Sequence, residues 1–328
     1  MYDTLAFALT KRCTAACEIC CFSSCPTDKE TLNLDRVKQY IEESKDIEEI
    51  KTIAFTGGEP FLLYDDLLEL VSKARNAGKR VNAITNAFWA NTESVALEKL
   101  GALKSQGLNF LSLSFDSYHE KYVDVNNVRN VLRAATDLNI PTAISIVKVK
   151  NENIGHIVDR LGDAIYTSDI KVAPCLPSGR AAVNFSIDDF DRTINVDTCK
   201  CEYGGNLVVL YDGKVYPCCS QAVVDMDLSV GNFNELNLHE VMKLLKNNAL
   251  LYFLRNANFS FYVDYAREKL KIDVPDKVVS PCELCSILFK DNKVDLYYEY
   301  VESMIRKLRE AAVKWENYHY IWAVNTMR

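Results

Sequence analysis

Short apolar segments alternate with amphipathic segments through residues 5–175, and this alternation limits the possible folds more than any other feature of the chain. Helical spacing of apolar residues is found at residues 32–41, 65–77, 92–104, 128–138 and 154–161. Strands are predicted between and beside them at residues 5–9, 50–55, 80–85, 108–115, 141–149 and 170–173. Such an order builds a parallel sheet with right-handed crossovers. An open doubly wound sheet and a partial barrel both fit it.

Three cysteines follow the first predicted strand with the spacing C-x3-C-x2-C, at Cys13, Cys17 and Cys20. Cysteine thiolates hold iron–sulfur clusters, normally four to a [4Fe–4S] cube. Three ligands would leave one iron open to the polar atoms of a small molecule. Structural zinc instead takes paired C-x2-C or histidine ligands, and this triplet contains one such pair in a chain with four histidines. The spacing therefore favours an iron–sulfur cluster over a zinc knuckle.

Composition narrows the class of protein. The chain has 328 residues, which suggests about two domains, with 48% hydrophobic and 25% charged residues, as in ordinary globular proteins. A net charge of −7 argues against a nucleic-acid partner. Neither a membrane-spanning apolar stretch nor a signal peptide is recognised, so we expect a cytoplasmic protein without a membrane partner. Its twelve cysteines then indicate metal ligands and redox thiols rather than disulfides.

Polar and glycine residues stand where the predicted strands end. In parallel barrels the chemistry gathers at the carboxyl ends of the strands. Glycines there allow the backbone to approach a ligand closely, and a carboxylate offers a direct contact. Several of the polar residues could equally cap a helix or bind solvent. The candidate binding residues at these ends are Gly57, Gly58, Glu59, Asn86, Ser114, Asp116 and Lys148.

The alternation is lost after about residue 175. Residues 208–216 predict a β-hairpin with Asp212-Gly213 at its turn, and helical spacing follows at residues 238–251 and 253–271. A long amphipathic helix ends the chain, and we expect it to pack on the body; a coiled-coil seam for a partner is the alternative. Its apolar positions are Val294, Tyr298, Val301, Ile305, Leu308, Ala312 and Trp315.

Taken together, these motifs resemble the radical S-adenosylmethionine (radical SAM) peptide-modifying enzymes, and especially the epipeptide epimerases. The similarity runs to about residue 290; a departure is Ala87, where glycine is more usual. The segments that carry it are Cys13, Cys17, Cys20-Cys21-Phe22, Cys25-Pro26-Thr27, Phe55-Thr56-Gly57-Gly58-Glu59, Asn86-Ala87-Phe88-Trp89, Asp116-Ser117-Tyr118-His119, Tyr216-Pro217-Cys218-Cys219-Ser220, Cys282 and Cys285.

The resemblance implies an α/β fold with three parts. Residues 1–190 would form a partial (β/α)6 barrel of the TIM type, residues 191–290 a smaller auxiliary iron–sulfur domain of the SPASM or twitch kind, and residues 291–328 the C-terminal helix. SAM would chelate the open iron of the first cluster. The Gly57-Gly58-Glu59 motif would contact its amino group, and Asn86, Ser114, Asp116 and Lys148 its ribose and carboxylate. Arg180, in a Pro-Ser-Gly-Arg-Ala segment, would hold the methionyl carboxylate.

The resemblance also implies a second [4Fe–4S] cluster. Cys201, Gly213 and Cys218 match the C-x9-15-G-x4-C opening of the auxiliary domains, and Cys282 and Cys285 would complete four ligands. Cys199 fits the first position as well, and a zinc ribbon built from the same residues is the alternative. Two clusters are therefore expected in total.

Cys219 is left over beside a predicted ligand. A thiol can give a hydrogen atom to a carbon radical, although a spare structural cysteine is the alternative reading. In the epimerases a 5′-deoxyadenosyl radical removes an α-hydrogen from a precursor peptide, and the cysteine that matches Cys219 returns one from the opposite face. The expected partners are this ribosomal peptide and an external electron donor, a flavodoxin or ferredoxin. Peptide crosslinking, a twitch-type dehydrogenase, and a binding protein without activity remain alternatives.

Overall fold

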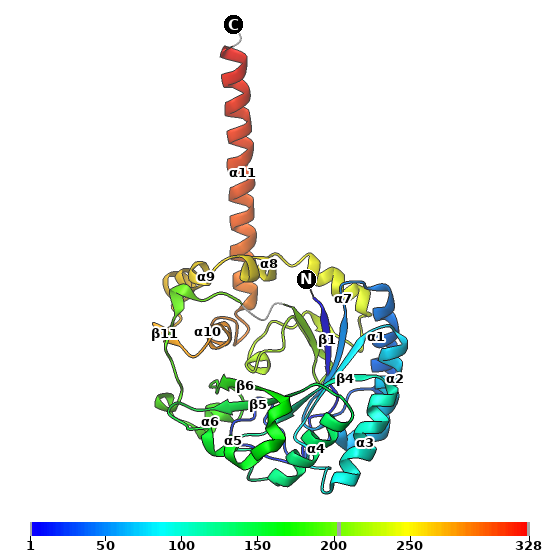
Figure 1. The fold of residues 1–328 in the computed structure, drawn as a ribbon. Helices are drawn as coiled ribbons and strands as arrows, with labels where there is room; N and C mark the ends of the chain where they lie inside the picture. The colour runs from blue at the N-terminus through cyan, green and yellow to red at the C-terminus, as the bar shows by residue number, and fades with distance from the viewer. Residues whose placement is uncertain (1, 202–204, 327–328) are drawn as a thin grey trace.

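The computed structural model describes residues 2–201 and 205–326, with side chains described as far as residue 311. Within these residues a nine-stranded sheet has the order β10-β9-β8-β1-β2-β3-β4-β5-β6, and β1 to β6 are parallel neighbours in sequence order. Figure 1 shows the sheet curved, with the helices on its outer side. The predicted partial barrel is confirmed. Its strands are β1 (Thr4–Ala8), β2 (Thr52–Thr56), β3 (Arg80–Thr85), β4 (Leu108–Ser114), β5 (Thr142–Lys148) and β6 (Ser168–Pro174).

The crossover helices form where apolar spacing and capping residues coincide. In the fourth of them Val128, Val131 and Leu132 are buried against the sheet, and the Asp124 side chain caps the first turn by accepting from the Asn126 N–H. The fifth crossover helix, α5, is short and begins without a side-chain cap. The bounds are α1 (Leu34–Glu43), α2 (Tyr64–Asn76), α3 (Glu93–Gln106), α4 (Val125–Asp137) and α5 (Gly155–Leu161).

The second part of the chain extends the same sheet. Strand β8 (Asn206–Val209) pairs in parallel with β1, and β9 (Lys214–Tyr216) returns antiparallel to it, with β10 (Gly231–Asn232) beyond. The predicted hairpin is present, and Gly213 at its turn has a φ of +84° that favours glycine. Because β8 lies parallel to β1, the turn between β8 and β9 and the cysteine loop that follows β1 lie at the same edge of the sheet, whereas β9 carries the chain back toward the opposite edge.

Short helices complete this part. The two helices expected at residues 238–271 are broken into more pieces, because Asn248 caps a new helix by accepting from the Leu251 N–H and the chain turns again before Phe259. The elements are α6 (Ala181–Asn184), β7 (Ile194–Asn195), α7 (Leu238–Lys246), α8 (Ala249–Asn256), α9 (Ser260–Tyr265), a π-helical turn Ala266–Leu270, β11 (Lys277–Val278) and α10 (Pro281–Leu288).

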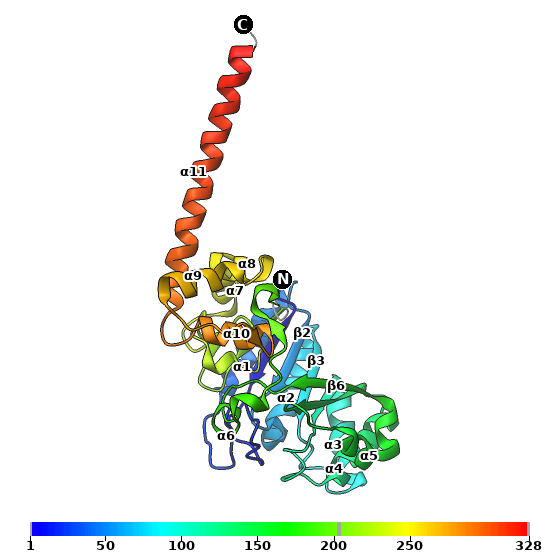
Figure 2. The same ribbon diagram turned by 90° about the vertical axis from the view of Figure 1, so that its left-hand side faces the viewer.

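The C-terminal helix α11 (Val294–Thr326) projects away from the body, as Figures 1 and 2 show. Tyr297 and Val301 are buried near its start, whereas Leu308 is 58% exposed. The prediction that the whole helix packs on the body is therefore wrong, because the body ends at α8 and α9 and covers the first turns alone. The predicted apolar positions Ala312 and Trp315 lie outside the described side chains. No helix in the described residues is both long and apolar enough to cross a membrane.

Candidate functional site

The predicted cysteine triplet lies at the carboxyl ends of the barrel strands. Cys13, Cys17 and Cys20 all line one cavity of ≈ 220 Å³. Burial raises the pKa of the Cys13 thiol to about 12, so an iron–sulfur cluster would have to displace its proton. Three sulfur donors around one cavity fit a [4Fe–4S] cluster with an open iron. The other lining residues predicted from sequence are Gly57, Gly58, Glu59, Asn86 and Ser114.

The two glycines hold the base of the cysteine loop. The Gly58 N–H donates to the Thr10 carbonyl at 2.6 Å, and the Glu59 N–H donates to the Arg12 carbonyl at 2.9 Å. A Cβ at Gly57 would stand 2.5 Å from the Thr10 carbonyl oxygen, and one at Gly58 would overlap the Arg12 carbonyl. Glycine is therefore required at both positions for the strand end to reach the loop.

The Glu59 carboxylate is buried and hydrogen-bonded to neighbouring segments of the chain. It is 1% exposed and accepts hydrogen bonds from the Thr85 hydroxyl at 2.8 Å, the Asn86 N–H at 2.8 Å and the Phe61 N–H at 3.0 Å. Burial raises its pKa to about 7, and these hydrogen bonds oppose the rise. The carboxylate thus ties β2 to the end of β3 on one wall of the cavity.

Asn86 connects that wall to the cysteine loop. Its side-chain amide donates to the Thr14 hydroxyl at 3.1 Å and to the Cys13 sulfur at 3.7 Å. The next residue, Ala87, has a φ of +67°, a left-handed conformation that costs a non-glycine residue roughly 1–2 kcal/mol. The departure noted at Ala87 in the sequence therefore falls on a strained turn beside the cavity.

Asp116 does not line the cavity itself but holds His119, which does. It is 1% exposed, and its Oδ1 accepts from the His119 ring Nδ1 at 2.8 Å and from the Tyr118 and His119 N–H groups. His119, not Asp116, lines the cavity. Burial lowers the pKa of His119, but the charge of Asp116 and hydrogen bonds to Asp116 and Cys17 outweigh it and raise the pKa well above its usual value.

Arg180 and Lys148 do not line the cavity. The Arg180 guanidinium donates to the carbonyls of Cys17, Ser23 and Ser24, each at 2.8 Å. The structure therefore gives Arg180 the cysteine loop as its partner, where the sequence suggested a bound carboxylate. The Lys148 ammonium donates to the Glu152 carbonyl at 3.3 Å, which turns it toward the loop after β5.

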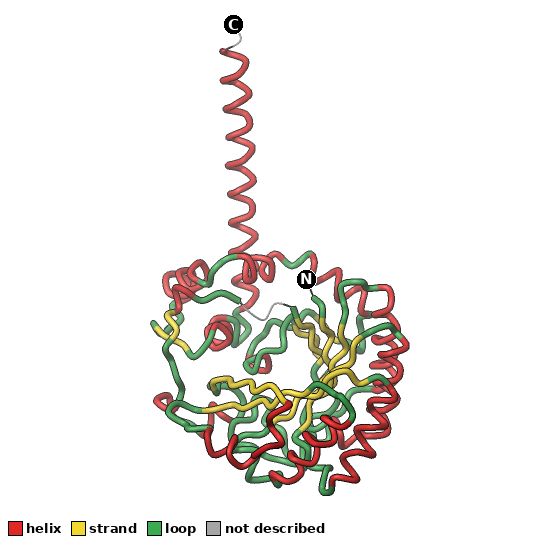
Figure 3. Tube along the Cα trace, in the orientation of Figure 1, coloured by secondary structure: helices red, strands yellow, loops and turns green. Residues whose placement is uncertain are grey.

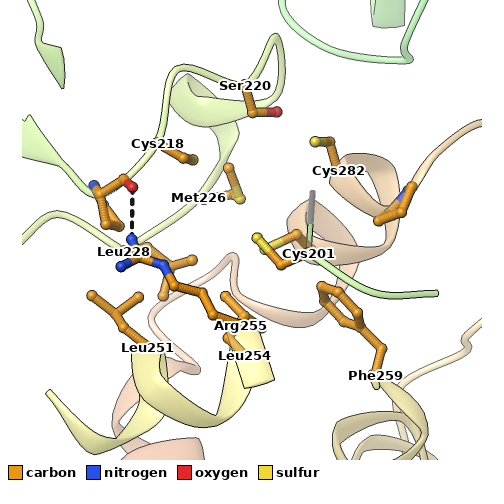
Figure 4. Close-up of a pocket in the computed structure, with 13 residues that line it drawn as sticks. Cys201, Cys218, Ser220, Met226, Leu228, Leu251, Leu254, Arg255, Phe259 and Cys282 are labelled. Carbon is orange, nitrogen blue, oxygen red and sulfur yellow. Dashed lines mark hydrogen bonds between the residues drawn. The ribbon is translucent and has the colours of Figure 1, made fainter. Parts of the chain in front are cut away.

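The four cysteines predicted as auxiliary ligands also line one cavity. They come from three segments, since Cys282 and Cys285 share α10. Figure 4 shows Cys201, Cys218 and Cys282 around a common space with Met226. Cys285 lines the same cavity, and burial raises its pKa well above the usual value. A single zinc ion needs ligands that converge on one point. Four sulfur donors around one cavity also fit a [4Fe–4S] cluster, which takes four thiolate ligands.

Cys199 and Cys219 lie outside this set. Cys199 is buried, its sulfur faces the Asn195 carbonyl at 3.6 Å, and it does not line the cavity. Cys219 is exposed and lines a different cavity of ≈ 180 Å³. There the Asn206 side-chain amide donates to its sulfur at 2.9 Å. Desolvation of the sulfur by the surrounding protein raises the pKa of Cys219, so the thiol stays protonated.

The comparisons with known proteins agree with this geometry. Residues 7–164 match the radical SAM superfamily, and residues 199–286 match SPASM, an iron–sulfur cluster-binding domain. YydG of Bacillus subtilis (strain 168), whose name links it to peptide biosynthesis, is 30% identical over 313 residues, covering 92% of this chain and 97% of that protein. The chain belongs to the radical SAM superfamily. Its predicted cofactors, SAM and [4Fe–4S] clusters, are those of the two matched families.

Solved radical SAM structures share the fold. The structure of Streptococcus suis SuiB bound to S-adenosylmethionine superposes with a TM-score of 0.57 at 14% identity, covering 89% of this chain and 77% of that one. The structure of anSMEcpe with AdoMet and the Cp18Cys peptide gives a TM-score of 0.51 at 15% identity, covering 92% and 99%. At these identities the likeness establishes the partial barrel and its attached second part.

Two residues of this radical SAM site were missed in the sequence. His119 lies in a segment that carried the family resemblance, but nothing marked it as facing the cavity. Gln221 lines both the triplet cavity and the cavity of Cys219. The sequence signal that could have identified Gln221 was its position two residues after Cys219, because neighbouring residues of a turn can line adjoining cavities.

We expect Arg180→Ala to weaken the cysteine loop, because three carbonyls lose a charged donor, with a cost of about 2 kcal/mol or more. The variant should melt at a lower temperature and bind less iron at the triplet, while Arg180→Lys keeps part of both. Iron content and SAM affinity distinguish a role of Arg180 in holding the cysteine loop from a direct contact with SAM. Normal iron with a weakened SAM affinity would contradict the loop role and favour a contact with SAM.

Cys201→Ala should remove about half of the iron, because one of two four-iron clusters loses a ligand. Cys199→Ala is the matched control and should keep its full iron content. Iron and sulfide assays after anaerobic reconstitution measure both. Loss of iron in the Cys199 variant, with retention in the Cys201 variant, would reverse the assignment of the first auxiliary ligand.

Proposed function

We propose that this radical SAM enzyme acts on a ribosomally synthesised precursor peptide and converts L-residues into D-residues. The peptide substrate is supported by the relative YydG, whose name links it to peptide biosynthesis and which matches nearly the whole chain. The epimerase chemistry is supported by the place of Cys219. A peptidyl epimerase needs a hydrogen-atom donor that can reach the site of the radical.

One observation carries the proposal. Cys219 follows Cys218 directly in sequence but does not line the cavity of the four auxiliary cysteines. It lines the neighbouring cavity, and Gln221 lines that cavity and the cavity of the cysteine triplet. A thiol exposed there can meet a peptide that also reaches the triplet cavity.

Cys13, Cys17 and Cys20 would hold the cluster to which SAM binds, and one-electron reduction of SAM there would supply the 5′-deoxyadenosyl radical for removal of the peptide α-hydrogen, which would pass to 5′-deoxyadenosine. The S–H bond of Cys219 then breaks, and its hydrogen atom forms the new Cα–H bond on the opposite face. Asn206 holds the sulfur in place through its hydrogen bond. One electron from an external flavodoxin or ferredoxin and one proton from solvent restore the thiol. The peptide keeps its composition, as an isomerisation requires.

The proposal assigns the two cysteine sets to two parts of the chain. Residues 1–190 would hold SAM and the first [4Fe–4S] cluster through Cys13, Cys17 and Cys20. Residues 191–290 would hold one auxiliary [4Fe–4S] cluster through the four cysteines that share a cavity. With all four positions filled, this second cluster has no open iron, so it cannot bind a second SAM in the same way.

Cys219→Ala should abolish formation of D-residues while SAM is still cleaved to 5′-deoxyadenosine, because the radical forms but finds no thiol. Cys219→Ser should behave alike, since an alcohol O–H bond is too strong to donate the atom. Chiral amino-acid analysis of the hydrolysed peptide and the iron content measure the effect.

A Cys219→Ala enzyme that still makes D-residues would contradict the donor role. Peptide crosslinking is distinguished in the same samples, because a crosslinked peptide loses two hydrogen atoms, whereas an epimerised peptide keeps its mass. A product lighter by that amount in the wild type would replace the proposed function with crosslinking.

A further inference from the structure

Strand β6 forms the free edge of the barrel sheet. It pairs with β5 along its whole length, from Thr142 opposite Ser168 to Lys148 opposite Pro174. On its other side the described residues provide no strand, and Figure 3 shows β6 as the border of the curved sheet. Its backbone is therefore available for pairing along one edge.

The direction of the backbone groups can be assigned. The Cys175 N–H donates to the Lys148 carbonyl at 2.7 Å, so residue 175 faces β5. Because alternate residues of a parallel strand direct both backbone groups to the same side, Lys171 and Ala173 also face β5. The N–H and C=O groups of Ile170 and Val172 then point outward, and no described residue bonds to them.

This edge is only partly protected, by the exposed charged side chains of Asp169 and Lys171 and by Pro174. Natural edge strands are shielded by charge, proline, bulges or a covering element. In β6 the side chains of Ile170 and Val172 are 44% and 47% exposed, and Pro174 stands at the far end. The helix that follows, α6, has four residues and does not cover them. An edge strand with two exposed apolar side chains and no covering element is a site for strand addition.

The edge leads into the proposed reaction site. Ala173, Pro174 and Leu176, at the carboxyl end of β6, line the cavity that contains Cys219. By register Ala173 lies opposite Val147, which lines the triplet cavity. A chain added along β6 would therefore run toward the thiol and place every second side chain on the side of the triplet cavity.

We propose that the precursor peptide binds in extended form as an added strand on the free edge of β6, paired with the backbone of Ile170 and Val172. This inference rests on the proposed function. Main-chain hydrogen bonds would supply the affinity, and alternate side chains the specificity. An unstructured peptide fits such an edge because its backbone donors and acceptors are unpaired. The strand end then delivers a peptide residue to the cavity of Cys219.

Val172→Pro tests the pairing, because proline removes an outward N–H and is tolerated at edge strands. Val172→Thr is the matched control, since it keeps the N–H and suits a strand. The probe is a labelled synthetic peptide with the sequence of the ribosomal precursor, and its dissociation constant is measured by fluorescence anisotropy. We expect binding about tenfold weaker for the proline variant, the loss of one hydrogen bond, and wild-type affinity for the threonine variant.

A second measurement leaves the protein intact. Single N-methylation along the peptide should weaken binding at every second position over a short stretch, because alternate amides of an added strand face β6. Equal affinity for Val172→Pro and the wild type, or an N-methyl scan without alternation, would overturn the inference. Epimerisation that continues in those experiments would leave the proposed function standing, whereas a wild type that neither binds nor modifies the peptide would overturn both.

Discussion

The arrangement of the site depends on a short connection, residues 178–180, that ties the two cysteine-bearing regions together. Arg180 donates to three carbonyls of the triplet loop, and its own N–H donates to the Cys20 carbonyl at 3.0 Å. On the other side the Ser178 hydroxyl bonds to Asp225 and donates to the Gln221 carbonyl at 2.9 Å. Between them Gly179, with a φ of +54°, passes so close to Cys21 that a Cβ would overlap its carbonyl.

This connection explains how residues far apart in sequence come to share one reaction space. The triplet lies after β1, and the segment that carries Cys219 lies after β9, but β8 and β1 are paired neighbours. Strand β9 runs antiparallel to β8 and carries the chain away from the edge that holds the triplet. Residues 178–180 therefore connect the two segments, because they bond to the triplet loop on one side and to Gln221 and Asp225 on the other. Gln221 is fixed through its backbone carbonyl and so lies where both cavities meet. The bonds of residues 178–180 thus hold the triplet loop and Gln221, while Asn206 holds the Cys219 sulfur.

Local patterns predicted the fold and the clusters because their physical basis is local. Strand and helix periods, the triplet spacing and the glycine motif depend on nearby residues. The directions of Asp116, Lys148 and Arg180 could not be predicted, because a buried polar side chain turns to whichever partners the packed chain provides. The predicted packing of the whole of α11 on the body was wrong for a related reason. Its apolar positions were identified from the sequence, but their burial depends on how far the rest of the protein extends along the helix.

In the proposed reaction a protein thiol returns a hydrogen atom to a peptide α-carbon. Thiol protons exchange with solvent, so the most direct test is turnover of the precursor peptide in D2O, with tandem mass spectrometry and chiral analysis of the product. If Cys219 is the donor, each D-residue carries one solvent-derived deuterium at its α-carbon, and Cys219→Ala gives none. D-residues without deuterium at the α-carbon, or a modified peptide without D-residues, would contradict it.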